Sequence, residues 1–212
     1  MVIRQATEQR PRTKPPEERR DELMNSAQHL FLKQGVAPTT IEQITSQAGV
    51  AKGTFYLYFS SKEEVLAALG ERFGQELLKS IQAAIAAKPQ TDWKATLAIW
   101  ARACVSGYLD SIQLHDMIFL GSHRPKHEHD HEKRREGLVD NVVIDHLAQL
   151  LQAGMDAGAW SIDDIRFTAV FLFNGLHSVV DDAYSREKRL NRSRLRQRVE
   201  DMYFRSVGLN LL

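Results

Sequence analysis

Residues 39–59 constrain the fold of this chain more than any other stretch, because they hold the signals for two short helices joined by a tight turn. Thr40 and Gln43 have the spacing of a capping box, in which each side chain satisfies a free backbone N–H at the start of a helix. A helix is therefore predicted to begin at Ile41. Gly49 follows, and its backbone freedom suits a tight turn.

The segments on either side of this turn complete a three-helix unit. A helix is predicted over residues 52–59, where Phe55 and Phe59 lie four residues apart and face inward. A preceding helix is predicted from Glu17 to Gly35, since its apolar residues form one stripe with a period of 3.6 and glycine commonly ends helices. Two short helices joined by a glycine-containing turn, with small or apolar residues between them, form a helix-turn-helix.

The rest of the chain also has helical periodicity. Ser61 and Glu64 repeat the capping box and predict a long helix that ends before Pro89. No stretch alternates apolar and polar residues as a strand would, so the expected fold class is all-α. Five further helices are predicted, at about 92–111, 114–120, 132–157, 162–185 and 192–207. The expected organisation is a flexible basic arm at 1–16, a helix-turn-helix domain at 17–62 and a larger helical domain at 63–212.

Composition excludes several classes of protein. Residues 1–62 hold nine Lys or Arg against six acidic residues, whereas residues 63–212 hold 19 against 21. A mildly basic head on a neutral body suits phosphate binding. No apolar run approaches the ~20 residues that cross a bilayer, and residues 1–20 lack the apolar segment of a secretion signal. We therefore expect no membrane partner and a cytoplasmic location. The single cysteine, Cys104, cannot form an internal disulfide.

One segment resembles a known family closely. About 45 residues resemble the DNA-binding signature of the tetracycline-repressor (TetR) family, from the helix predicted at Glu17 to the start of the long helix after Ser61. The C-terminal part of the chain matches the family only in length and helical pattern. The resemblance is carried by Thr39-Thr40-Ile41 and by Gly53-Thr54-Phe55-Tyr56-Leu57-Tyr58-Phe59-x-Ser61-Lys62-Glu63-Glu64. It implies a dimeric repressor that binds a palindromic DNA operator and is released by a small-molecule effector.

The resemblance also implies roles for individual residues on DNA. Tyr56 and Lys62 would contact phosphates, and Thr40 would both cap its helix and touch the DNA backbone. The residues expected in or beside the major groove are Lys52, Gly53, Thr54 and Tyr58. Ala51 departs from the serine that is frequent in the family, so the recognition helix should lack a side-chain N-cap. The alternative is that the two tyrosines pack on the preceding helix at residues 17–35. Lys52 and Lys62 would then be ordinary solvated surface charges.

The last two predicted helices suit the four-helix dimer bundle that the resemblance implies. Residues 162–185 are unusually apolar, and Gly175 allows another helix to approach closely. The apolar positions are Phe167, Val170, Phe171 and Val180, with Asn174 among them, and Leu195, Val199, Met202 and Phe204 add a second surface. An intramolecular core is the alternative interpretation. Dimerisation supplies two recognition helices, which read enough bases for specific binding.

A ligand cavity is expected among the middle helices. The candidate lining residues are Trp100, Cys104, Tyr108, Phe119, Phe171 and His177. Each of them could equally be ordinary core. His177 and Asp181, at i and i+4, could orient a polar group of the ligand or form a satisfied core pair.

The segment from His123 to His131 carries four histidines interleaved with acidic residues, which suits zinc or nickel ligation. The spacing matches no compact metal site, so we predict a solvated loop, with no metal and no cofactor. A metal sensor or metal-dependent enzyme, and an architectural protein with a purely structural helix-turn-helix, are the competing hypotheses. We predict no enzyme, because the chain has no GxSxG, HExxH or phosphate-loop motif.

Overall fold

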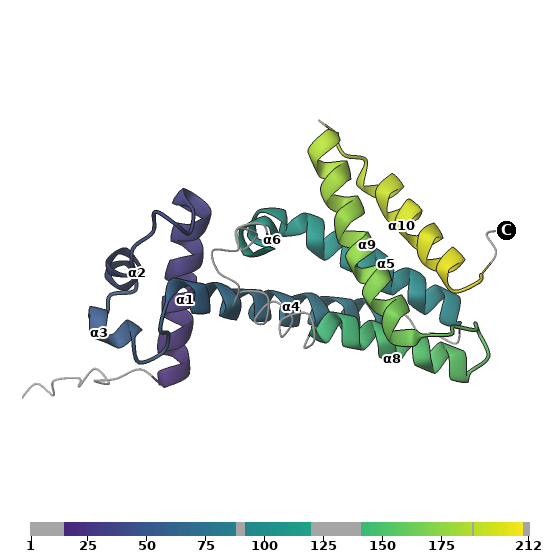
Figure 1. Cartoon of the computed structure of the whole chain (residues 1–212), viewed down its shortest axis with the longest axis horizontal. Helices are drawn as coiled ribbons and strands as arrows, with labels where there is room; N and C mark the ends of the chain where they lie inside the picture. Colours follow the sequence, from purple (N-terminus) through teal and green to yellow (C-terminus); the bar gives the residue numbers. More distant parts are fainter. Residues whose placement is uncertain (1–14, 88–91, 120–140, 188, 210–212) are drawn as a thin grey trace, which may run out of the picture. The chain divides into compact units, whose positions relative to one another are not determined.

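The computed structural model describes residues 15–87, 92–119, 141–187 and 189–209. These residues form helices and connecting turns, without strands, which confirms the all-α prediction (Figure 1). The chain forms two compact units, residues 1–69 and 70–212, and helix α4 runs through the boundary between them. The domain boundary expected at residue 62 stays a prediction. The basic residues of the N-terminal arm, Arg10, Arg12 and Lys14, lie outside the described residues.

The first unit is built from α1 (Pro16–Gln34), α2 (Ile41–Gln47), α3 (Lys52–Phe55) and the start of α4 (Lys62–Ala86). Its buried apolar residues include Leu23, Met24, Ala27, Phe31, Ile44, Phe55, Phe59, Val65 and Leu69. The capping box is present, since the backbone N–H of Gln43 donates to Thr40 Oγ1 and the backbone N–H of Thr40 donates to Gln43 Oε1. Gly49, with φ of +67°, forms the turn between α2 and α3.

The recognition helix is shorter than predicted. Helix α3 ends at Phe55, not at Phe59, because the chain then tightens into turns. The backbone N–H of Leu57 donates to the Thr54 carbonyl, and that of Tyr58 to the Phe55 carbonyl, each three residues back. Phe55 and Phe59 are nevertheless both buried, as expected, with ring centroids 5.9 Å apart.

The second unit contains the remainder of α4 together with α5 (Trp93–Asp110), α6 (Ile112–Phe119), α8 (Val142–Asp156), α9 (Ile165–Arg186) and α10 (Arg192–Ser206). Helix α10 packs along α5, and α8 packs along α9 (Figure 1). The side chains of Asp92, Asn141, Asp164 and Asn191 cap α5, α8, α9 and α10. The expected start of the α8 helix at residue 132 lies outside the described residues. None of the helices over the described residues is both long and apolar enough to span a membrane.

Candidate functional site

Helix α3 and the turn that follows it present exposed side chains beside a buried aromatic residue. Phe55 is fully buried, and the edge of the Tyr56 ring faces it at 5.5 Å between centroids. Tyr56 is itself 53% exposed, and Leu57 is 80% exposed. The buried Phe55 holds α3 against the unit, so the residues on the outer side of α3 keep a fixed position. Such an arrangement suits a short helix that reads another molecule.

The residues predicted to contact DNA divide into two groups by exposure. Lys52, Gly53 and Tyr56 are exposed, whereas Thr54 and Tyr58 are half-buried at the edge of α3. Leu57 was not among the sequence candidates, although it is the most exposed large apolar residue in the described part of the first unit. Its place between two tyrosines was the available signal, because an apolar side chain on a reading surface can contact a thymine methyl group.

Lys52, at the first position of α3, forms an ion pair with Glu42 of α2. The hydrogen bond to Lys52 lowers the pKa of Glu42, and the same bond raises the pKa of Lys52. Both side chains are more than half exposed, so the pair contributes little to stability. Its consequence is geometric: the ammonium is held at the outer edge of the turn, beside the start of the recognition helix.

Lys62 has a different environment from the one expected of a phosphate contact. Its ammonium donates hydrogen bonds to the carbonyls of Val36, Ala37 and Thr39, at 2.7, 3.0 and 2.6 Å. An ammonium has three protons, and all three have acceptors in the loop between α1 and α2. These three hydrogen bonds therefore connect the start of α4 to that loop. Its predicted contact with phosphate stays a prediction, and such a contact would replace at least one of these bonds.

Thr40 and Ala51 lie at the N-termini of the two helices of the motif. Thr40 is exposed, so its hydroxyl can cap α2 and still face an external group. Ala51 is the N-cap of α3 and provides no side-chain hydrogen bond, as predicted from the sequence.

In the second unit, three candidate ligand-lining residues lie on one side of α5. Trp100, Cys104 and Tyr108 are all fully buried. The ring of Trp100 stacks on Tyr203 at 5.9 Å, and its indole N–H donates to Nδ1 of His146 at 3.1 Å. Burial raises the pKa of the Cys104 thiol to about 12, so this cysteine acts as an apolar core residue.

Tyr108 and His177 come together, while two other candidates do not join them. The His177 ring stacks on Tyr108 at 4.9 Å, and the Tyr108 hydroxyl donates to Asp181. Phe171 corrects the prediction: it is 58% exposed and stacks on Phe167, because it lies on the side of α9 opposite to the buried Phe173. The side chain of the remaining candidate, Phe119, lies outside the described residues.

The predicted dimer surface needs a similar correction. Val180 and three of the four residues named on the last helix, Leu195, Val199 and Phe204, are buried within the chain, as the alternative interpretation held. The exposed apolar residues of α9 are Phe167, Phe171 and Val179, with Tyr184 further along. A hollow of about 500 Å³ lies beside Val179, lined otherwise by residues of α10.

These features define a helix-turn-helix protein whose second unit is a helical bundle with a buried polar centre. Comparisons with known proteins agree. Residues 23–69 match the family model "Bacterial regulatory proteins, tetR family". The chain is 37% identical over 75 residues to YerO of Bacillus subtilis, an HTH-type transcriptional regulator, covering 34% of this chain and 26% of that protein. It is 25% identical over 201 residues to YfiR of the same organism, covering 90% and 92% of the two chains.

Solved structures share the fold over nearly the whole chain. The FadR regulator of Bacillus subtilis in complex with stearoyl-CoA superposes with a TM-score of 0.69 at 22% identity, covering 90% of this chain and 99% of that one. The chain is thus a DNA-binding transcriptional regulator. Over residues 23–69 it resembles the TetR family, whose model it matches there.

Proposed function

We propose that the chain is a dimeric repressor, acting in the cytoplasm, that binds a palindromic operator and leaves it when a small molecule binds the second unit. The observation that carries the proposal is the exposed row of Lys52, Gly53, Tyr56 and Leu57 above the buried Phe55. It offers an ammonium, a phenol and an apolar group at one edge. Hydrogen-bond donors to phosphate and a base-edge contact are both needed for specific binding.

The DNA-binding part is tested by selecting bound duplexes from a random pool at two salt concentrations. We expect an inverted-repeat consensus that persists at the higher salt concentration, because base contacts depend less on salt than phosphate contacts do. Tyr56→Phe and Leu57→Ala should each weaken binding to that consensus. Tyr184→Phe is a matched control, since Tyr184 of α9 is 49% exposed, against 53% for Tyr56. Binding without any sequence preference would contradict the proposal.

The dimer is proposed to form through the exposed apolar side of α9. Phe167 and Phe171 are 67% and 58% exposed and stack on each other, and apolar area of this kind is costly to leave in water. Gly175 lies half-buried on the same helix. Phe171→Asp is expected to yield monomers in analytical ultracentrifugation without loss of helicity. Tyr184 lies on another side of α9 from Phe171, since a helix turns about 100° per residue, so Tyr184→Asp should leave the dimer intact. A Phe171→Asp protein that remains dimeric would refute this interface.

The effector is proposed to act near Tyr108 and His177 and to be sensed through α4. Phe73 of α4 packs edge-on against His115 of α6 at 6.0 Å, and a Cβ added at Gly70 would lie 3.1 Å from Ile118 of α6. A shift of α6 would therefore press on α4, which continues into the helix-turn-helix unit. An effector that favours one position of α4 would then change operator affinity. Phe73→Leu is expected to reduce the response to effector more than the affinity for DNA.

A further inference from the structure

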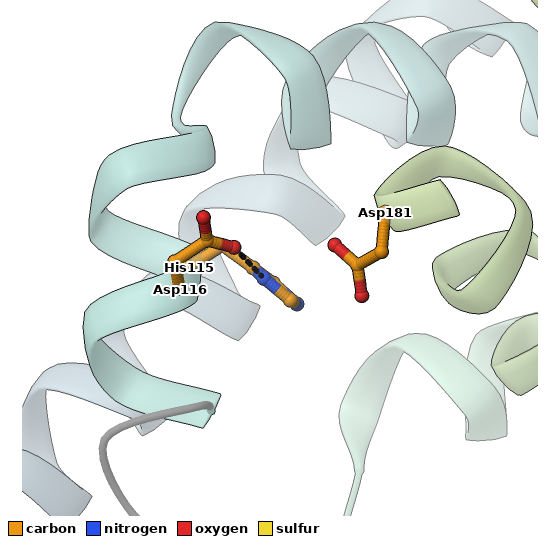
Figure 2. Close-up of side chains that lie close together, drawn as sticks. All are labelled: His115, Asp116 and Asp181. Carbon is orange, nitrogen blue, oxygen red and sulfur yellow. Dashed lines mark ion pairs between the residues drawn. The ribbon is translucent and has the colours of Figure 1, made fainter. Parts of the chain in front are cut away.

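A group of titratable side chains lies where α6 meets α9, beside the position proposed for the effector near Tyr108 and His177. His115 and Asp116 are neighbours on α6, and Asp181 comes from α9 with its carboxylate turned toward them (Figure 2). One ligand atom from each of the three residues lies within 4.8 Å of the others. His115 Nδ1 and Asp116 Oδ1 are 3.5 Å apart.

We propose that His115, Asp116 and Asp181 bind a divalent transition-metal cation of the zinc class. The donor set is one imidazole nitrogen and two carboxylates, which such cations accept readily. Ligand atoms around tetrahedral zinc lie about 3.4 Å apart, as follows from metal–ligand distances of about 2.1 Å. The pair on α6 already has this spacing, and the ligand atom of Asp181 lies within 4.8 Å of both.

Charge favours a cation at this position. Two carboxylates that face each other in a partly buried place repel unless a proton or a cation lies between them. The His115 side chain is buried, at 3% exposed, and burial disfavours the charged imidazolium. A neutral imidazole has a nitrogen lone pair to give to a metal.

The surroundings orient the three ligands. Tyr108 donates a hydrogen bond to Asp181 and so fixes that carboxylate. The Tyr108 ring also meets the His115 ring edge-on at 3.9 Å, and the His177 ring meets it at 5.0 Å. Metal ligands are typically held by such partners, whose removal weakens metal affinity 10- to 100-fold. Tyr108 is therefore a positioning residue for the site, and a bound cation would join α6 to α9.

The test is a titration of the full-length, chelator-treated protein with Co²⁺, followed by competition with Zn²⁺. We expect one equivalent of Co²⁺ per chain, visible d–d absorption and a rise in thermal unfolding temperature. Asp181→Asn removes the charge but keeps an acceptor for Tyr108, so the chain should still fold. Asp116→Asn is a second variant, and its side chain is 37% exposed. Each should bind Co²⁺ at least roughly 100-fold more weakly, since each loses a direct ligand.

The four histidines between residues 123 and 131 provide the decisive control, because they also offer imidazoles. A variant with all four changed to Asn should keep the full equivalent of Co²⁺. Loss of binding in that variant would overturn the proposal. So would wild-type protein without stoichiometric Co²⁺, or Asp116→Asn and Asp181→Asn proteins that bind as tightly as wild type. The titration contains no DNA, so its failure would leave the repressor proposal standing.

Discussion

Replacing Lys62 by Met tests whether this lysine holds the helix-turn-helix together or binds DNA phosphate. The substitution keeps most of the aliphatic stem and removes three hydrogen bonds to the carbonyls of residues 36, 37 and 39. A hydrogen bond to a charged group contributes ~1.5–3 kcal/mol when well buried. Two of these bonds are only partly buried and one is exposed, so we expect a total loss of about 2 kcal/mol. That loss corresponds to a roughly 30-fold change in the folding equilibrium.

The assay combines urea unfolding at fixed protein concentration with operator binding at several salt concentrations. If Lys62 only positions α2 and α3, then Lys62→Met lowers stability and operator affinity but leaves the salt dependence of binding unchanged. A phosphate contact, once removed, reduces the slope of log K against log salt by about 0.9. Lys52→Met is the matched control, because the Lys52 ammonium is exposed and paired only with Glu42. It should leave the unfolding midpoint unchanged.

The two measurements separate the roles cleanly. The structural role of Lys62 is refuted if the Lys62→Met protein unfolds at the wild-type urea concentration while the slope of log K against log salt decreases. In that case the hydrogen bonds to the three carbonyls contribute nothing net to stability, and water replaces the ammonium without cost.

Three further predictions follow from other parts of the chain. A Cβ at Gly53 would meet nothing within 4 Å, so Gly53→Ala should stabilise α3 by ~0.5–1 kcal/mol. The same substitution should weaken operator binding if DNA approaches the backbone at this position. Equal operator affinity would exclude that approach. A Cβ at Gly154 would lie 2.0 Å from the Trp160 ring, so Gly154→Ala should cost ~1–3 kcal/mol in thermal unfolding, and an unchanged melting temperature would contradict this packing. Burial lowers the pKa of His146 from 6.5, so the unfolded state binds the proton more readily than the folded state does. Stability should therefore fall as the pH drops below 6.5. His146→Gln, which can still accept a hydrogen bond from Trp100, should show a shallower decline of stability with pH in urea titrations.

The first unit could be predicted almost completely from the sequence, since its signals are local. Thr40 and Gln43 are three residues apart, and their reciprocal hydrogen bonds involve no other part of the chain. Gly49 adopts its positive φ at the turn itself. The end of α3 was predicted wrongly, because the chain after Phe55 forms three-residue turns in place of helix. Side-chain periodicity does not detect this difference, since Phe59 is buried in either case.

The faces of α9 could not be assigned in the same way. This helix carries apolar residues around most of its circumference, so a period of 3.6 selects no single buried side. Phe171 and Val180 are both plausible core residues by type, yet Phe171 is exposed and Val180 is fully buried. Which of them is covered depends on where α8 and α10 pack. That information is distributed over segments far apart in the chain.

The cluster of His115, Asp116 and Asp181 was not predicted from the sequence, although the sequence holds a signal for it. The four histidines between residues 123 and 131 suggested a metal site, although polar runs are common without any function. His115 and Asp116 instead lie in the largely apolar helix α6. Burying titratable groups is costly unless they find partners, so such a pair predicts a complementary group on a facing helix. Asp181, in the largely apolar α9, is that group, and the isolated polar pair was the stronger signal.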